Sequence, residues 1–150
     1  GITTFIVSIV VLLLWFPLKQ KPGIGTILNA ILISVVLDLS IVILPYPTDF
    51  FYQLIQVIFG ILIIGMGSGF YLAANLGPGP RDGLMTGLNK QTNQSLSLIR
   101  TFLELSAVGI GFYLGGIVGI GTILYAIGIG FSVSAGLFIV GKIYNYNFHK

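Results

Sequence analysis

The hexapeptide Gly-Ile-Gly-Thr-Ile-Leu occurs twice in this chain, at residues 23–28 and again at residues 119–124. Aligned without gaps, the stretches 22–39 and 118–135 share nine of eighteen residues. Chance similarity between apolar segments rarely preserves glycine and threonine positions as well. The pattern therefore indicates an internal repeat with a period of 96 residues and predicts a duplicated bundle of helices.

The composition places the chain in a lipid bilayer. Hydrophobic residues make up 55% of the sequence and charged residues only 7%, which lies outside the range of soluble domains. The absence of cysteine excludes disulfides and thiolate metal sites, and the net charge of +3 is too small to indicate a nucleic-acid partner. We expect an integral membrane protein whose partner is the bilayer, with no cofactor and no resident metal.

Five apolar runs approach the ~20 residues that a membrane-spanning helix needs. They cover residues 2–18, 24–44, 50–74, 96–115 and 118–141. The fold class predicted from them is an all-α, polytopic membrane bundle. Trp15 falls near the end of the first run, where amphipathic rings favour the headgroup layer.

The connections between these runs alternate in charge. Basic residues occur between the first and second runs, between the third and fourth, and after the fifth: Lys19, Lys21, Arg81, Lys90, Lys142 and Lys150. The other two connections contain no Lys or Arg. The positive-inside rule then places the basic connections and the C-terminus in the cytoplasm and Gly1 on the far side.

Extending the repeat backwards pairs the first run with the fourth and leaves the third without a counterpart. We therefore expect the missing helix to precede Gly1, as the chain opens on glycine directly before an apolar run. The predicted division is 1–44 for the incomplete first repeat, 45–49 for an outer loop, 50–146 for the second repeat and 147–150 for a cytoplasmic tail. Three helices per repeat would invert the second copy, a 3+3 arrangement common in secondary transporters.

The connection after the third run contains two Gly-Pro pairs, Gly77-Pro78 and Gly79-Pro80. Proline lacks an amide hydrogen and disfavours helical conformation in the residue before it, so the helix must break here. A short helix can restart over residues 81–88, which predicts a broken or re-entrant element near residues 76–90. The alternative is an ordinary cytoplasmic loop built from turn residues.

The fourth run carries two opposite charges, Arg100 and Glu104, one helical turn apart on the same face. An unpaired charge at the centre of a membrane helix costs roughly 2.5–3.5 kcal/mol, so such residues usually pair inside the bundle. We predict a network of both residues with Asp82, and Asn75 and Arg81 complete the candidate substrate-binding set. The alternative is a structural ion pair that only fixes helix packing.

Three further features are candidates for function or packing. Asp38, inside the second run, is a proton or cation site, as Glu104 also is, or it lies in the outer headgroup region if the helix ends early. The residues of the repeated motif form a second candidate set: Gly23, Gly25, Thr26, Gly119, Gly121 and Thr122. Small residues also recur at four-residue spacing, as at Gly65/Gly69 and Ser132/Gly136, which indicates close helix packing.

A family resemblance rests on residues 67–85, on Ile99-Arg100-Thr101 with Glu104, and on 114–122, and it covers nearly the whole chain. In these residues the chain resembles the YczE/YyaS/YitT group of bacterial integral membrane proteins. The resemblance implies a location in the bacterial cytoplasmic membrane. It also implies a further N-terminal helix and a Pro-x-Asp segment, which this sequence lacks. Members are often described only as membrane proteins or permeases.

Two functional hypotheses follow. One is a secondary transporter for a small, anionic solute, with the charged residues at the broken-helix site. The other is an accessory membrane protein that does not transport and binds a lipid or a partner protein. A homo-oligomer fits either hypothesis. The sequence contains no P-loop, zinc motif or nucleophile elbow, so we do not expect an enzyme.

Overall fold

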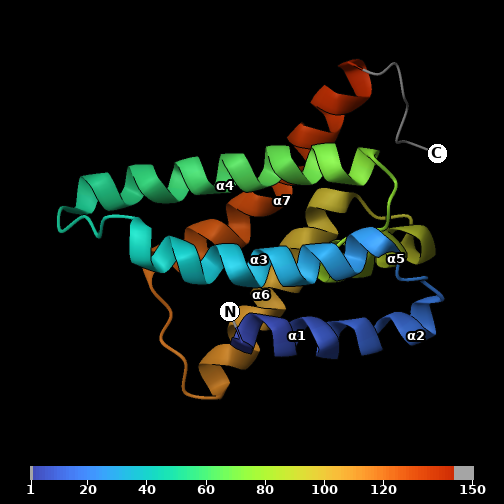
Figure 1. The fold of residues 1–150 in the computed structure, drawn as a ribbon, viewed down its shortest axis with the longest axis horizontal. Coiled ribbons are helices and arrows are strands. Elements are labelled where there is room, and N and C mark those ends of the chain that lie inside the picture. Colours follow the sequence, from blue (N-terminus) through green and yellow to red (C-terminus); the bar gives the residue numbers. More distant parts are fainter. Residues whose placement is uncertain (1, 144–150) are drawn as a thin grey trace. The chain divides into compact units, whose positions relative to one another are not determined.

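The computed structural model describes residues 2–143, and every regular element in that range is a helix. The helices are α1 (Ile2–Leu13), α2 (Trp15–Leu18), α3 (Ile24–Ile43), α4 (Phe50–Ala73), α5 (Pro80–Thr92), α6 (Leu96–Tyr113) and α7 (Ile120–Ile143) (Figure 1). Four of them, α3, α4, α6 and α7, are long and apolar enough to cross a membrane. The predicted helical membrane bundle is thus confirmed. The predicted tail at 147–150 lies outside the described residues.

The first predicted span differs from the structure. Residues 2–18 form two helices, α1 and α2, with a turn at Leu14. Pro17 explains the interruption, because it has no amide hydrogen for the carbonyl of Leu13 and its ring would clash with that carbonyl. The 12 residues of α1 extend about 18 Å, less than the ~30 Å of a hydrocarbon core. The count of five spans therefore stays a prediction.

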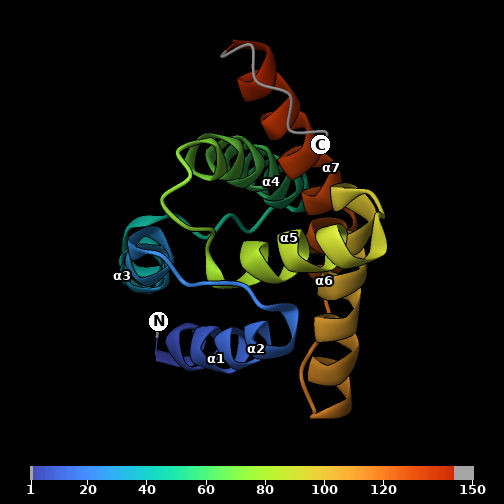
Figure 2. The same cartoon turned by 90° about the vertical axis from the view of Figure 1, so that its right-hand side faces the viewer.

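The chain divides into two compact units. The first unit comprises Gly1–Tyr46 and Asn75–Asn93, and thus contains α1, α2, α3 and α5. Within it α1 and α3 lie side by side and run in opposite directions, and α5 packs against α1, α2 and α3 (Figures 1 and 2). These units are defined by contacts between helices, and residues 75–93 therefore belong with the N-terminal helices. The predicted boundaries at residues 44 and 50 are defined by the sequence repeat, and that division stays a prediction.

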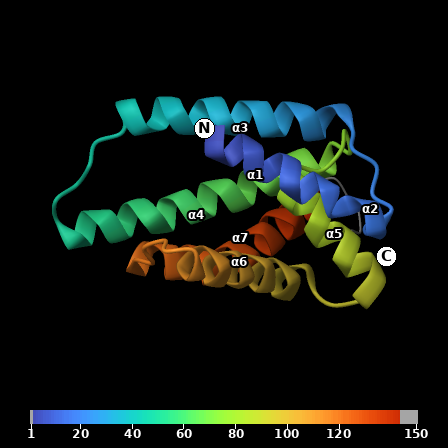
Figure 3. The ribbon, with the colours of Figure 1, turned by 90° about the horizontal axis from the view of Figure 1, so that it is seen from below.

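The second unit comprises Pro47–Ala74 and Gln94–Lys150, with helices α4, α6 and α7. Helix α7 packs against both α4 and α6 (Figure 3). The contact between α4 and α7 is close because small residues face each other: a Cβ atom on Gly65 would lie 2.5 Å from the Cβ of Ser132. The Ser132 hydroxyl donates a hydrogen bond to the carbonyl of Ile61, 2.8 Å away. The predicted small-residue packing is confirmed here.

The helix break predicted at the Gly-Pro pairs is confirmed. Helix α4 ends at Ala73, residues 76–79 form no helix, and α5 begins with Pro80 in its first turn. Proline suits that position because the first amide hydrogens of a helix have no partner within the helix. The new helix is longer than predicted, since it continues to Thr92.

Candidate functional site

The start of α3 forms hydrogen bonds to the backbone of the broken segment, the non-helical residues 76–79 between α4 and α5. The amide of Gly25 donates to the carbonyl of Leu76 (2.9 Å), and the Thr26 hydroxyl donates to the carbonyl of Pro78 (2.7 Å). The amide of Gly23 in turn donates to the Thr26 hydroxyl oxygen (3.1 Å). Thr26 is fully buried. The Thr26 side chain and the first-turn amide of α3 thus provide hydrogen-bond donors for two carbonyls that lie outside any helix, those of Leu76 and Pro78.

This contact requires glycine on both sides. Gly77 has a φ of +110°, a conformation that only glycine adopts readily, and a Cβ atom there would lie 2.8 Å from the Cα of Gly23. A Cβ on Gly25 would lie 2.8 Å from the carbonyl oxygen of Gly77. Two stretches of backbone therefore touch directly, and the repeated Gly-x-Gly-Thr sequence is what permits the approach.

Trp15 holds the N-terminus of α5. Its indole Nε1 donates a hydrogen bond to the carbonyl of Pro80 at 2.9 Å, and the side chain is 2% exposed. A Cβ atom on Gly83 would overlap the indole ring, so the glycine gives α5 its close approach. The structure thus gives Trp15 a packing role against α5, and its predicted position in the headgroup layer stays a prediction.

The predicted substrate-binding residues of the first unit differ in exposure. Asn75 is exposed and has a φ of +53°, directly after the end of α4. Arg81 is exposed in the first turn of α5, whereas Asp82 beside it is buried. A carboxylate in the first turn of a helix is favoured by the helix dipole. The three residues therefore share one segment, and only Asp82 has a buried side chain.

The charged pair predicted in the fourth run forms in α6 of the second unit. Helix α6 begins after Ser95, whose hydroxyl accepts a hydrogen bond from the amide of Leu98. One and two turns later, Arg100 Nη2 and Glu104 Oε1 are 3.0 Å apart, and both side chains are more than nine-tenths buried. The pairing of these two residues is confirmed. The membership of Asp82 in their network stays a prediction.

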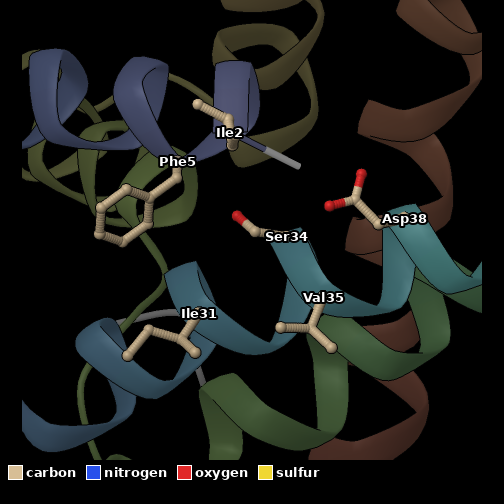
Figure 4. A pocket seen from close by; sticks show the side chains of 6 residues that line it. All are labelled: Ile2, Phe5, Ile31, Ser34, Val35 and Asp38. Carbon is tan, nitrogen blue, oxygen red and sulfur yellow. The ribbon is translucent and has the colours of Figure 1, made fainter.

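Asp38 lines a pocket in the first unit. The pocket, of about 270 Å³, lies between α1 and α3 and is lined by Ile2, Phe5, Ile31, Ser34, Val35 and Asp38. Figure 4 shows the polar side chains of Ser34 and Asp38 pointing from α3 toward α1. Helix α3 continues to Ile43, so Asp38 lies inside the helix, and the alternative in which this helix ends early does not apply. Its role in proton or cation binding stays a prediction.

The structure places no acidic or histidine cluster suited to a metal within residues 2–143. Among the polar groups that it does bring together are backbone carbonyls at the α3 terminus and the ion pair of Arg100 and Glu104 in α6. Neither arrangement resembles a nucleophile beside a general base. The α3 terminus binds backbone carbonyl groups, and the side chains of Arg100 and Glu104 can bind charged groups.

Comparison with known sequences places the chain in a family. Residues 1–136 match a family described as "Family of unknown function (DUF6198)". The chain belongs to this family. It is 41% identical to an uncharacterized protein of Haemophilus influenzae over all 150 residues, which are 69% of that protein. It is 38% identical over 109 residues to the uncharacterized membrane protein YczE of Bacillus subtilis, covering 73% of this chain and 51% of YczE.

The match to YczE confirms the resemblance inferred from the sequence. It supports membership of a YczE-like family of membrane proteins and gives no activity. No solved structure matches the chain. The longer lengths of both relatives mean that an account of the whole protein's function is a proposal.

Sequence reasoning missed two residues that lie against the broken segment and the start of α5, Trp15 and Asn29. The side-chain amide of Asn29 lies so close to Gly79 that a Cβ atom on this glycine would overlap it. Both residues contact a segment some fifty or more positions further along the chain, so no local pattern reveals the contact. The available signal was the pair of Gly-Pro steps, whose backbone needs partners from elsewhere in the fold.

Proposed function

We propose that the complete protein is a secondary transporter for a small anionic solute, with the Arg100–Glu104 pair as the charged element of its pathway. The observation that carries the proposal is the burial of both side chains on an otherwise apolar, membrane-length helix. Ionisable residues inside membrane helices are expensive and usually mark ion or substrate pathways. The broken segment before α5 adds a second feature typical of transporters.

The pair suggests a division of roles. Arginine presents a fixed fork of donors that suits carboxylate or phosphate groups, and it stays charged. A glutamate next to it can release the arginine for an anion when it takes up a proton. Glu104 is therefore the proton-coupling residue in this proposal, and Arg100 binds the solute. The 3+3 inverted repeat and the cytoplasmic C-terminus belong to the same proposal.

The test is transport by the complete protein in proteoliposomes. Lactate, acetate, phosphate and sulfate are the probes, and solid-supported-membrane currents with and without a pH gradient are the readout. We expect a current with at least one anion, lost in Glu104→Gln. Asp49→Asn is the matched control, because Asp49 is an exposed carboxylate outside the helices. Circular dichroism and size-exclusion profiles establish that each variant folds.

Two outcomes would contradict the proposal. An undiminished current in folded Glu104→Gln removes the coupling role of that residue. No current with any anion, together with a protein or lipid that co-purifies in stoichiometric amount, favours the accessory protein. That second function has its own support in the 3.0 Å Arg100–Glu104 contact, since a buried ion pair can simply fix helix packing.

A further inference from the structure

The two copies of the hexapeptide fold alike. Each opens a long apolar helix, α3 or α7. In each, the threonine amide donates to the carbonyl of the first glycine, at 3.1 Å for both Thr26 to Gly23 and Thr122 to Gly119. Four residues after each threonine an alanine is buried, and each helix packs against the preceding apolar helix of its own unit. The copies thus start their helices alike, although the bond from the Gly23 amide to the Thr26 hydroxyl has no counterpart at Gly119 and Thr122 in the described residues.

Their surroundings differ sharply. Thr26 is fully buried beneath the segment whose carbonyls it binds, whereas Thr122 is exposed. A Cβ atom on Gly23 would overlap the carbonyl oxygen of Leu76 in its own unit, whereas a Cβ on Gly119 would meet no atom within 4 Å among the described residues of the second unit. The second copy has the same binding groups: Gly119 and Thr122 are exposed, and Gly121 is half-buried, with a Cβ position 3.4 Å from the side chain of Val57 in α4.

We propose that Gly119–Thr122 is a docking site for an extended backbone segment of the same polypeptide, lying ahead of Gly1. The segment would present two carbonyl groups two residues apart, as Leu76 and Pro78 do at the first copy. The first-turn amide of Gly121 and the hydroxyl of Thr122 are the donors. This inference concerns how the protein assembles and does not depend on transport.

Two observations select this occupant. The first copy, in the first repeat, binds residues 76–78 of the second repeat; exchanging the two repeats pairs the second copy with the positions 96 residues before 76–78, which lie ahead of Gly1. The aligned region covers 69% of one relative and 51% of the other, so both relatives are longer than the part that matches this chain. A lipid chain as the occupant would not explain the second glycine of the motif, because glycine is needed only where another backbone approaches closely.

The same comparison predicts what the occupant can carry. In the first unit the ring of Trp15 fills the space beside α5 and requires glycine at position 83. The repeat pairs Trp15 with Gly111 of α6, where an added Cβ would meet nothing within 4 Å among the described residues. The occupant of the second site can therefore carry a side chain at the position that matches Gly83.

The test uses single cysteines in the complete gene product, with any cysteine outside these 150 residues replaced. The 150 residues contain none of their own. Thr122→Cys is labelled with a membrane-impermeant maleimide. Ile117→Cys in the adjoining loop, 97% exposed, is the reactive control, and Thr26→Cys, fully buried, is the protected control. We expect Thr122→Cys to react about tenfold or more slowly than Ile117→Cys, because it reacts only when the segment opens.

A second variant tests the close approach itself. Gly119→Ala should restore fast labelling of Thr122→Cys, since the added methyl group would block the backbone, as it would at Gly23. A photo-crosslinking residue in place of Ile120, which is 61% exposed, then identifies the occupant by mass spectrometry. The expected product is an intramolecular crosslink to a peptide ahead of Gly1.

Several results would overturn the inference. They are labelling of Thr122→Cys as fast as that of Ile117→Cys, labelling unchanged by Gly119→Ala, and a crosslink to lipid or to another protein. A gene product without residues ahead of Gly1 would overturn it as well. None of these results bears on the anion currents, so failure here and failure of the transporter proposal are distinguishable.

Discussion

The contact between α4 and α7 makes a quantitative prediction for Gly136→Ala. A methyl group at this position would overlap the carbonyl oxygen of Gly65 and lie 3.1 Å from the Cα of Met66. All of these are backbone atoms, which cannot rotate aside as a side chain can, so the two helices must separate. Such overpacking costs about 1–3 kcal/mol.

A matched control removes the intrinsic effect of the substitution. Alanine is favoured over glycine inside a helix by roughly 0.5–1 kcal/mol, which opposes the cost of the clash. Gly67→Ala in α4 has the same gain and no clash, because its Cβ would meet nothing within 4 Å in the described residues. The difference between the two variants therefore isolates the packing cost, and Gly136→Ala should be the less stable by about 1–3 kcal/mol.

The assay is reversible unfolding of the complete protein in mixed micelles of increasing SDS content, followed by far-UV circular dichroism. Gly67→Ala should unfold at or above the wild-type midpoint and Gly136→Ala below it. If the two variants have the same free energy of unfolding to within about 0.5 kcal/mol, which is typical of surface substitutions, α4 and α7 do not touch through these glycines. Gly65→Ala, whose methyl group would meet Ser132, should then fail to destabilise as well.

Two further predictions use the same titration. Arg100→Leu and Glu104→Leu should each lower the free energy of unfolding by about 3–5 kcal/mol because each removes one partner of a buried ion pair, and the double variant should lose less than either single one. Additive losses would contradict a buried pair. Trp15→Phe should cost about 1–3 kcal/mol, because the carbonyl of Pro80 loses its donor inside the fold; an unchanged midpoint would mean that this carbonyl finds water.

Much of the fold follows from local chemistry. Apolar runs of sufficient length predicted the positions of α3, α4, α6 and α7 to within a few residues. The Gly-Pro steps predicted the break before α5, since proline acts on its immediate neighbours. The missed interruption at Leu14 had the same kind of signal, because Pro17 stands four residues after Leu13. The run was nevertheless predicted as one helix because its residues are almost all apolar.

The site was predictable only where its contacts are local. Arg100 and Glu104 lie one turn apart on one helix, so their pairing could be read directly from the spacing. The bond from Thr26 to Pro78 joins residues 52 positions apart, and that from Trp15 to Pro80 joins residues 65 apart. Such contacts depend on how helices of the first unit pack, which the spacing of residues within one helix does not determine.

The repeated hexapeptide shows how a sequence pattern can be recognised before its purpose is known. Apolar helices in a bilayer have little reason to keep Gly-x-Gly-Thr, because lipid-facing positions tolerate any apolar residue. At α3 the motif has a physical explanation: two glycines let backbones meet, and a threonine satisfies a carbonyl that no helix serves. The same three residues at α7 retain those properties while Thr122 is exposed. That difference between the two copies is what the docking site proposed at Gly119–Thr122 would explain.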